Sequence, residues 1–421
     1  MYDEVVITHS GEGQSIITVN CPDKTGLGCD LCRIILFFGV SILKGDISTD
    51  GKWCYLVFWV LGSKDTRWVL LKKRLLEACP PCVAASGISY FVPDLHTPKP
   101  ADVFLLKLCC RDRKGLLHDV AKVLFDLELT IKKVQVCTTP DGRVVDLFFV
   151  TDSRELLHTI MRKEDTKNYL QDAIGAFLLS VDIEMVGQEI TACSLESSFL
   201  PSSITEDSLL QHISDKHHTL LSSSSVSVST DYTSTLSKVS VKLDNSFSPS
   251  HTLVQILSRD HKGLLYDVMR TFKDYNIQIS YGRFSAKVRG DCEVDLFIQQ
   301  GEGKNIGDVS KQKELAARLL RELQRPLRVA VVNRGPDSEL LVANPVELSG
   351  KGRPLVFHDI TLALKKLDTC VFTAEIRRRK IGDKEFEVYR ILLGDGENLP
   401  SSRCEIEDVV WKTLMGWDVR L

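Results

Sequence analysis

The sequence predicts an α+β protein of four ferredoxin-like βαββαβ units with antiparallel sheets, arranged as two pairs. Three observations predict this fold. A short loop signature recurs along the chain, the strand and helix patterns around each copy follow one order, and a Ser/Thr-rich stretch separates the second copy from the third. The chain has 421 residues, of which 43% are hydrophobic, and this is enough to build several small cores.

The loop signature joins an aspartate, a glycine and a leucine at the start of an apolar run. It reads Asp23-Lys-Thr-Gly26-Leu27, Asp112-Arg-Lys-Gly115-Leu116-Leu117-His-Asp119-Val120, Asp260-His-Lys-Gly263-Leu264-Leu265-Tyr-Asp267-Val268 and, degraded, Gly352-Arg-Pro-Leu355-Val-Phe-His-Asp359-Ile360. Gly26 and Gly115 are 89 residues apart, as are Gly263 and Gly352, whereas 148 residues separate Gly115 from Gly263. Because a fixed period marks one structural unit per copy, we expect repeats 1 to 4 to stand as two pairs with an insertion between the pairs.

Each repeat has the same predicted order of elements. In repeat 2 the pattern predicts strand 103–109, helix 116–127, strands 132–138 and 144–151, helix 169–178 and strand 180–186. In repeat 3 the corresponding segments are 253–257, 263–275, 277–287, 293–299, 311–324 and 327–332. Asp50-Gly51-Lys52 and Ile381-Gly382-Asp383 are the expected hairpin turns of repeats 1 and 4. The predicted domains are 14–92, 102–187, 251–334 and 337–421.

The insertion is visible in the composition of residues 188–250, which we interpret as a linker. From Ser222 to Thr235, ten of fourteen residues are Ser or Thr, and these cannot supply a packed core. Two short alternating segments, Glu4–Thr8 and Val239–Leu243, favour an extra strand ahead of repeats 1 and 3. Duplication of a whole two-repeat block would explain this arrangement.

Charge and cysteine content point to an intracellular protein. The net charge of −3 creates no basic field for nucleic acid, and the apolar runs fall short of the roughly 20 residues that span a membrane. The thirteen cysteines mostly lie in apolar runs and are expected to be reduced; 46 residues lie between the pairs Cys29/Cys32 and Cys79/Cys82, so no metal site is expected. We expect a cytoplasmic location. The basic run Arg377–Lys380 is compatible with a nuclear-import signal, although we favour its interpretation as solvent-facing charges on a strand.

The chemistry of the loop suits a small zwitterion. An aspartate at a strand end either caps the following helix or faces a ligand ammonium group. The glycine allows close approach to the backbone, and the helix N-terminus offers free N–H groups to a carboxylate. The alternative is a tight strand-to-helix turn with no ligand, and the residues alone favour that alternative.

The recurrence of this strand, loop, helix and hairpin resembles the ACT domain family. The pattern is most similar to the paired ACT domains of bacterial uridylyltransferases that sense glutamine, and four copies without an enzyme resemble the plant ACT domain repeat proteins. The resemblance implies regulatory domains that bind small amino acids at interfaces between paired sheets. It assigns ligand binding to the matching loop positions, which are Asp23, Gly26, Leu27, Asp112, Gly115, Leu116, Asp260, Gly263 and Leu264.

Other positions of the signature are expected to be structural. Repeat 4 departs from the family pattern, because Ser349 stands where the aspartate is expected, although Gly352 remains. Asp119 and Asp267 lie one turn into their helices, where an acid suits the helix dipole. His118 and His358 share a repeat position and have no nucleophile beside them, so we expect no catalysis, metal or cofactor.

Two hypotheses for function follow. In the first, the protein is an amino-acid sensor, with a glutamine-like ligand at the interfaces between repeats and a protein partner that responds to the change. In the second, it is a scaffold whose sheets recruit another protein and whose loops are vestigial. Both hypotheses allow a homodimer, and neither predicts a membrane or a nucleic acid as a partner. We favour the sensor.

Overall fold

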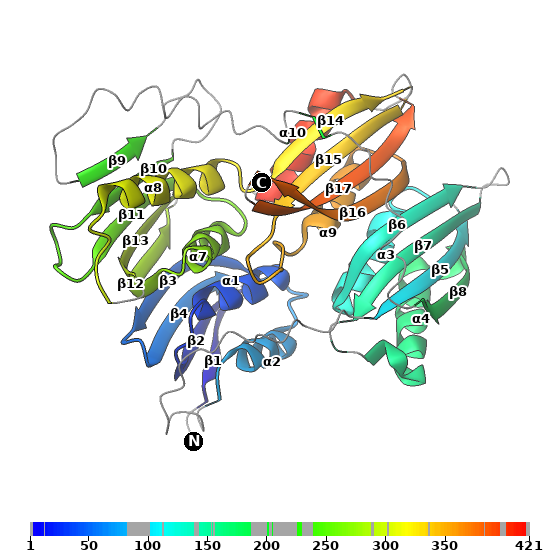
Figure 1. Ribbon diagram of the computed structural model, residues 1–421. Coiled ribbons are helices and arrows are strands. Elements are labelled where there is room, and N and C mark those ends of the chain that lie inside the picture. Colours follow the sequence, from blue (N-terminus) through cyan, green and yellow to red (C-terminus); the bar gives the residue numbers. More distant parts are fainter. Residues whose placement is uncertain are drawn as a thin grey trace. The chain divides into compact units, whose positions relative to one another are not determined.

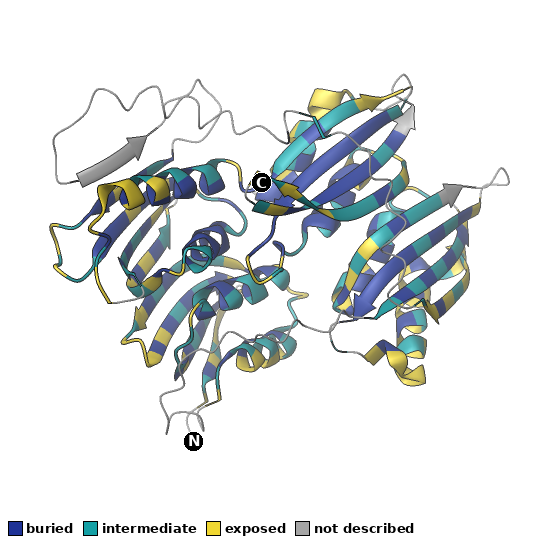
Figure 2. Cartoon of the chain, in the orientation of Figure 1, coloured by how far each residue is buried: buried dark blue, intermediate teal, exposed yellow. Residues whose placement is uncertain are grey.

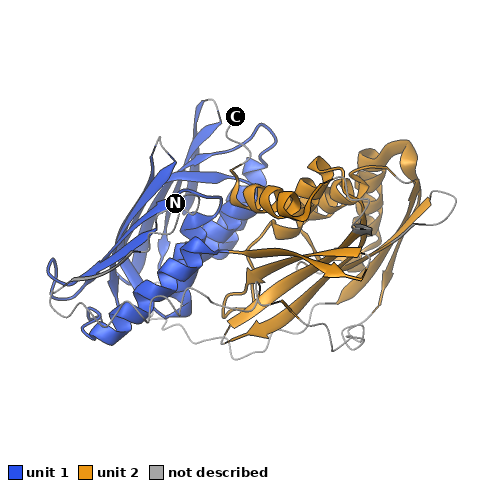
Figure 3. Ribbon diagram, turned by 90° about the horizontal axis from the view of Figure 1, so that it is seen from above, with its two compact units in different colours: residues 1–95, 207–326 blue, residues 96–206, 327–421 orange. Residues whose placement is uncertain are grey.

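The computed structural model describes the chain outside residues 1–2, 12, 82–101, 112, 139–142, 153, 155, 187–199, 202–203, 205–224, 230–238, 288–289, 301–302, 336, 383, 396–400 and 418–421. The described residues form an α+β protein with two antiparallel sheets (Figure 1). Compact unit 1 consists of residues 1–95 and 207–326, and compact unit 2 of residues 96–206 and 327–421 (Figure 3). The prediction of two pairs is confirmed. Repeat 1 pairs with repeat 3, however, and repeat 2 with repeat 4, so the pairs are interleaved along the chain rather than consecutive.

Compact unit 1 is built on a nine-stranded sheet in the order β1-β2-β4-β3-β12-β13-β11-β10-β9. The strands are β1 (Val5–Gly11), β2 (Gln14–Pro22), β3 (Ser41–Thr49), β4 (Trp53–Leu61), β9 (Ser225–Ser229), β10 (Ser240–Asp244), β11 (Thr252–Arg259), β12 (Gln278–Ala286) and β13 (Asp291–Gln299). The helices are α1 (Leu27–Phe37), α2 (Trp68–Ala78), α7 (Leu264–Asp274) and α8 (Val309–Gln324). The antiparallel pairing of β3 with β12, from Ser48↔Tyr281 to Lys44↔Ser285, joins repeats 1 and 3 edge to edge.

Compact unit 2 is built on an eight-stranded sheet in the order β14-β15-β17-β16-β6-β7-β5-β8. The strands are β5 (Val103–Arg111), β6 (Leu129–Thr138), β7 (Arg143–Asp152), β8 (Leu178–Met185), β14 (Arg328–Arg334), β15 (Asp337–Pro345), β16 (Val371–Ile381) and β17 (Lys384–Asp395). The helices are α3 (Leu116–Asp126), α4 (Ile160–Ile174), α9 (Val356–Lys366) and α10 (Arg403–Met415), with short 3-10 turns at Leu156–His158 and Gly175–Phe177. Here β16 and β6 join repeats 4 and 2.

The strand that completes the sheet of a repeat either follows the second helix or precedes the first strand. In repeat 2 it follows the second helix, as predicted, and β8 lies beside β5. The extra strands predicted ahead of repeats 1 and 3 are confirmed as β1 and β10, which lie beside β2 and β11. The segment Leu327–Val332, predicted to close repeat 3, instead forms β14 and pairs with β15 of repeat 4. A preceding and a following strand cover the same sheet edge, so the sequence pattern does not distinguish them.

One face of each sheet packs against helices, and Figure 2 shows burial alternating along the strands. In β4, Cys54, Leu56, Phe58 and Val60 are buried, while Trp53, Tyr55 and Leu61 are exposed on the other face. The period of two places every second side chain in the core. Across each pair, α1 packs on α7 and α3 on α9. We call these helix contacts, with the loops that lead into the helices, the seams. No helix in the described part of the chain is long and apolar enough to cross a membrane.

Candidate functional site: the loops at the two seams

Each first helix of a repeat begins at a residue with left-handed backbone. Gly26, Gly115 and Gly263 stand there with φ of 79°, 75° and 82°. Glycine adopts this conformation without strain, so the glycines of the signature are required by the turn itself. They lie at the loop-to-helix junction that the sequence predicts.

The fourth copy of this turn differs from the sequence expectation. Leu355, with φ of 69°, holds the left-handed position, and Gly352 lies three residues earlier in an isolated β-bridge to Val346. Asp359 follows Leu355 by four residues, just as Asp119 follows Gly115. The structural counterpart of the signature glycine is therefore Leu355, and Gly352, not Ser349, stands where the first aspartate is found elsewhere.

Side chains of the neighbouring strands β15 and β17 lie against this fourth loop. The Asn344 amide donates to the Arg353 carbonyl at 3.1 Å and to Glu387 Oε2 at 3.2 Å. A Cβ atom on Gly352 would clash with the Glu387 carboxylate. These two side chains therefore occupy the position beside Gly352.

The other predicted site residues have distinct environments. The Thr49 hydroxyl donates to Asp23 Oδ2 at 2.6 Å; burial raises the pKa of the Asp23 carboxyl, and the hydrogen bonds from Thr49 and the Lys24 backbone partly oppose this. Asp260 is half-buried, and its backbone N–H donates to the Gly290 carbonyl at 2.7 Å. Asp112 lies outside the described residues. Leu27, Leu116 and Leu264 are buried and anchor their helices in the two cores.

At each seam a lysine at the end of one helix pairs with an aspartate on the helix of the paired repeat, and neither pair was predicted from the sequence. Lys273 at the end of α7 places its Nζ 2.9 Å from Asp30 Oδ1 on α1. Lys365 at the end of α9 places its Nζ 2.7 Å from Asp119 Oδ1 on α3. Burial alone would raise the pKa of Asp119, but Lys365 and Arg113 hold it below its usual value. Asp119, expected to serve only the helix dipole, therefore binds a cation across the seam.

The same lysines lie directly on the signature glycines. A Cβ on Gly26 would come within 2.8 Å of Lys273 Cδ, and a Cβ on Gly115 within 2.7 Å of Lys365 Cδ. Only a residue without a side chain lets the lysine chain pass so close to the loop backbone. Each of these two loops therefore already holds a primary ammonium group, supplied by the paired repeat.

A second contact ties each loop to its own helix. The residue after the first aspartate pairs with the aspartate of the first helical turn: Lys24 with Asp30 at 3.4 Å, Arg113 with Asp119 at 2.6 Å and His261 with Asp267 at 3.1 Å. The aspartate of repeats 1 and 2 thus lies between two cations, one from its own loop and one from the paired repeat.

Asp267 in repeat 3 has a different set of partners. Besides His261, the fully buried Arg270 lies 3.6 Å from Asp267 Oδ1 and donates to Glu322 Oε2 at 2.7 Å. Arg318 pairs with Glu322 at 3.0 Å. His261 and Arg270 both belong to repeat 3, whereas the helix aspartates of repeats 1 and 2 each also meet a lysine of the paired repeat.

Two histidines meet at the seam of compact unit 2. The His118 ring lies 4.9 Å from the His358 ring, and His118 Nδ1 is 3.1 Å from the Thr361 hydroxyl. Burial and the neighbouring His358 lower the pKa of His118 to about 4. His118 is therefore neutral at physiological pH.

The sequence does contain one signal that could have identified the seam lysines. Lys273 and Lys365 both stand ten residues after the left-handed residue, whereas the same position is Leu36 in repeat 1 and Phe125 in repeat 2. This position is a lysine in repeats 3 and 4 and an apolar residue in repeats 1 and 2. The contrast indicates that repeats 3 and 4 supply the lysine of each ion pair and repeats 1 and 2 supply the aspartate. Its meaning depends on the interleaved pairing, which the sequence did not reveal.

Comparison with known families covers most of the chain. A model described as an ACR9-like, ACT-like domain matches residues 240–337, and the model of the ACR10 N-terminal region matches residues 6–80. The model of the ACR9 C-terminal region matches residues 338–416, and the general ACT domain model matches residues 104–166.

Curated relatives agree with these matches over the full length. The chain is 57% identical over 422 residues to the ACT domain-containing protein ACR10 of Arabidopsis thaliana, and the match covers 99% of both chains. It is 47% identical over 425 residues to ACR9 of the same plant, again covering 99% of both. A match of 32% identity over 87 residues links 20% of the chain to 9% of a bifunctional uridylyltransferase/uridylyl-removing enzyme of Azospirillum brasilense.

Proposed function

Since the chain belongs to the ACR family of ACT domain-containing proteins, we propose that it is a non-catalytic regulatory protein that binds an amino acid at its seams. The ligand lies beside the Asp-x-x-Gly loop, and a protein partner responds to the change in the seam. One observation carries the proposal: beside Gly26 and beside Gly115, an aspartate of the first helical turn holds a primary ammonium group.

In this proposal the lysine and the ligand compete for one position. An amino-acid ammonium takes the place of Lys273 Nζ at Asp30, or of Lys365 Nζ at Asp119, and the free N–H groups at the helix start take the carboxylate. Displacing the lysine lowers the apparent affinity, because the loop is open for only a fraction of the time. It also releases the ion pair that ties α1 to α7 or α3 to α9, and this release is the signal passed to a partner.

A specific observation also supports the scaffold as a second candidate. The lysine chains cover Gly26 and Gly115, and side chains fill the loop of repeat 4, so these loops are closed as they stand. In the scaffold the lysines are permanent structural ties. The two candidates differ in whether any free amino acid stabilises the fold.

A thermal-shift screen of the twenty common amino acids against the full chain separates them. A ligand that binds the folded state raises the melting temperature by mass action. The sensor predicts a rise with at least one amino acid at 10 mM, and loss of that rise in the Asp30→Asn, Asp119→Asn variant. The Asp408→Asn variant, whose carboxylate pairs with Lys412 within α10, is the control. No rise with any amino acid would leave the scaffold as the function.

A further inference from the structure

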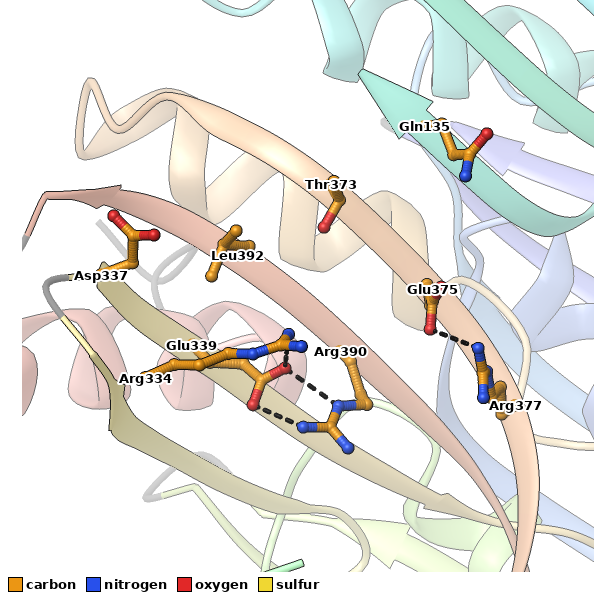
Figure 4. Close-up of a pocket in the computed structure, with 9 residues that line it drawn as sticks. All are labelled: Gln135, Arg334, Asp337, Glu339, Thr373, Glu375, Arg377, Arg390 and Leu392. Atoms are coloured by element: carbon orange, nitrogen blue, oxygen red, sulfur yellow. Dashed lines mark hydrogen bonds and ion pairs between the residues drawn. The ribbon is translucent and has the colours of Figure 1, made fainter. Parts of the chain in front are cut away.

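A cavity lies on the face of the sheet of compact unit 2 that is turned away from the helices (Figure 4). Its volume is about 380 Å³, which lies within the usual range for small-molecule sites. Strands β14, β15, β17, β16 and β6 supply its lining, so the cavity extends across the edge where repeats 4 and 2 join. The seam loops lead into helices that pack on the opposite face.

A buried arginine forms one part of the lining. Arg390, with its side chain only 9% exposed, donates from Nε to Glu339 Oε1 at 2.9 Å and from Nη2 to Glu339 Oε2 at 2.7 Å. Its third nitrogen, Nη1, is buried and has no hydrogen-bond partner within the described structure. Arg334 donates to the same Glu339 carboxylate at 3.2 Å. Two guanidinium groups thus share the Glu339 carboxylate, which compensates only one of their two positive charges.

A further carboxylate lies beside this cluster, because Asp337 on β15 is the register partner of Arg334 on β14. Figure 4 shows Asp337 at the far end of the cavity from Arg377, and its carboxylate has no ion pair with any residue that the structure describes. Glu375 is already neutralised, by Arg377 at 2.9 Å and Lys133 at 3.9 Å. Asp337 is therefore the carboxylate available to a cation.

Neutral polar groups complete the site. Thr373 on β16 and Gln135 on β6 are register partners across the joining edge, and both line the cavity. The Thr373 hydroxyl and the Gln135 amide offer hydrogen bonds to a polar side chain of the ligand, while Leu392 supplies an apolar contact. In total, the lining carries three arginines and three carboxylates, so a neutral ligand with separated charges matches it better than a simple anion.

We propose that this cavity is a second binding site, for a small zwitterion of the polar amino-acid class. Its carboxylate meets Arg334 and the unpaired nitrogen of Arg390, and its ammonium meets Asp337. This inference goes beyond the proposed function, because it uses another face of compact unit 2 and none of the loop residues.

Calorimetric titration of the full chain with each of the twenty common amino acids tests the proposal. The variants are Asp337→Asn and Arg334→Gln, both at the rim of the cavity. Lys107→Gln is the matched control, since Lys107 lies on β5 of the same sheet and pairs with Glu184 at 2.7 Å outside the cavity. Each ligand found is compared with its α-amide, which lacks the carboxylate, and with inorganic phosphate.

The proposal predicts that Asp337→Asn and Arg334→Gln each weaken one binding event at least tenfold, while Lys107→Gln leaves it unchanged and neither the amide nor phosphate replaces the amino acid. Binding that is insensitive to both cavity variants but lost in Asp30→Asn, Asp119→Asn would overturn the cavity proposal and leave the proposed function standing. Binding lost only in the cavity variants would do the reverse. An absence of binding at 10 mM overturns both.

Discussion

Lys273 of repeat 3 reaches across its seam to Asp30 of repeat 1, with 2.9 Å between Nζ and Oδ1, and its carbon chain lies on Gly26. Lys365 and Asp119 repeat this relationship in compact unit 2 at 2.7 Å, over Gly115. The two seams thus share one arrangement in which a lysine occupies the loop where the family resemblance places a ligand.

Removing the lysine charge should weaken each pair of repeats to a different degree. Lys273 is 19% exposed and Lys365 is 41% exposed, and solvent screens the more exposed pair more strongly. We expect Lys273→Met to lower the free energy of unfolding by about 1 kcal/mol and Lys365→Met by roughly half as much. Urea unfolding of each variant measures this, with Lys412→Met, in an exposed pair within α10, as the control. Equal losses in all three variants would contradict a role for the seam.

Replacing a loop glycine by alanine should lower the free energy of unfolding by more than backbone strain alone would. Gly26→Ala places Cβ against Lys273, whereas Gly39→Ala, also with positive φ, meets open space and measures the strain of about 1–2 kcal/mol. Gly382→Ala, also with positive φ and open space around the added Cβ, is the corresponding control for Gly115→Ala.

We expect the excess cost at Gly26 to disappear when Lys273 is also replaced by alanine. A double-mutant cycle followed by urea unfolding measures this coupling. Additive losses would show that the lysine chain does not press on the loop.

Stability of compact unit 2 should fall as the pH drops from 6.5 to 4. Burial and His358 lower the pKa of His118 to about 4, so in this window the unfolded chain binds a proton that the folded chain excludes. Lys365 and Lys122 oppose the charge on His118, and Asp119 favours it. Allowing for solvent screening, we expect a loss of about 2 kcal/mol by pH 4, and none of this loss above pH 6.5.

The His118→Gln variant isolates this contribution. It should flatten the dependence of the unfolding free energy on pH between 4 and 6.5, as measured by urea titration at a series of pH values. A wild-type curve that matches the variant curve would exclude His118 as the titrating group.

The network around Arg270 should be the most costly to break. Arg270→Met leaves Asp267 and Glu322 buried with less compensation, and loss of one partner from a buried ion pair costs about 3–5 kcal/mol. Arg283→Met removes an exposed pair with Asp46 between β12 and β3 and should change stability little. Similar unfolding midpoints for the two variants in urea would contradict this ranking.

Much of the fold follows from local patterns in the sequence. Repeats, element order and hairpin turns depend on residues close together in the chain, and they were predicted. The pairing of the repeats was not predicted, because it depends on which sheet edges are complementary. Strand β3 pairs with β12 although more than 200 residues separate Ser48 from Tyr281. The segment at Leu327–Val332 was assigned to the wrong repeat for the same reason.

The site was predicted less completely than the fold. The spacing of glycines pointed to Gly352, whereas the four-residue spacing from Leu355 to Asp359 identifies the true turn. A leucine in left-handed backbone is rare, so no sequence rule would place it there. Lys273 and Lys365 were missed because their role exists only across the seam.

The central claim is that a free amino acid competes with the seam lysines for the loop aspartates. Calorimetric titration of the wild-type chain and of the Lys273→Ala, Lys365→Ala variant with the twenty amino acids tests it most directly. We predict that at least one amino acid binds both proteins, and binds the variant at least tenfold more tightly because the competing ammonium groups are gone. Equal affinity in the two proteins, or no heat from either at 10 mM, would contradict the claim.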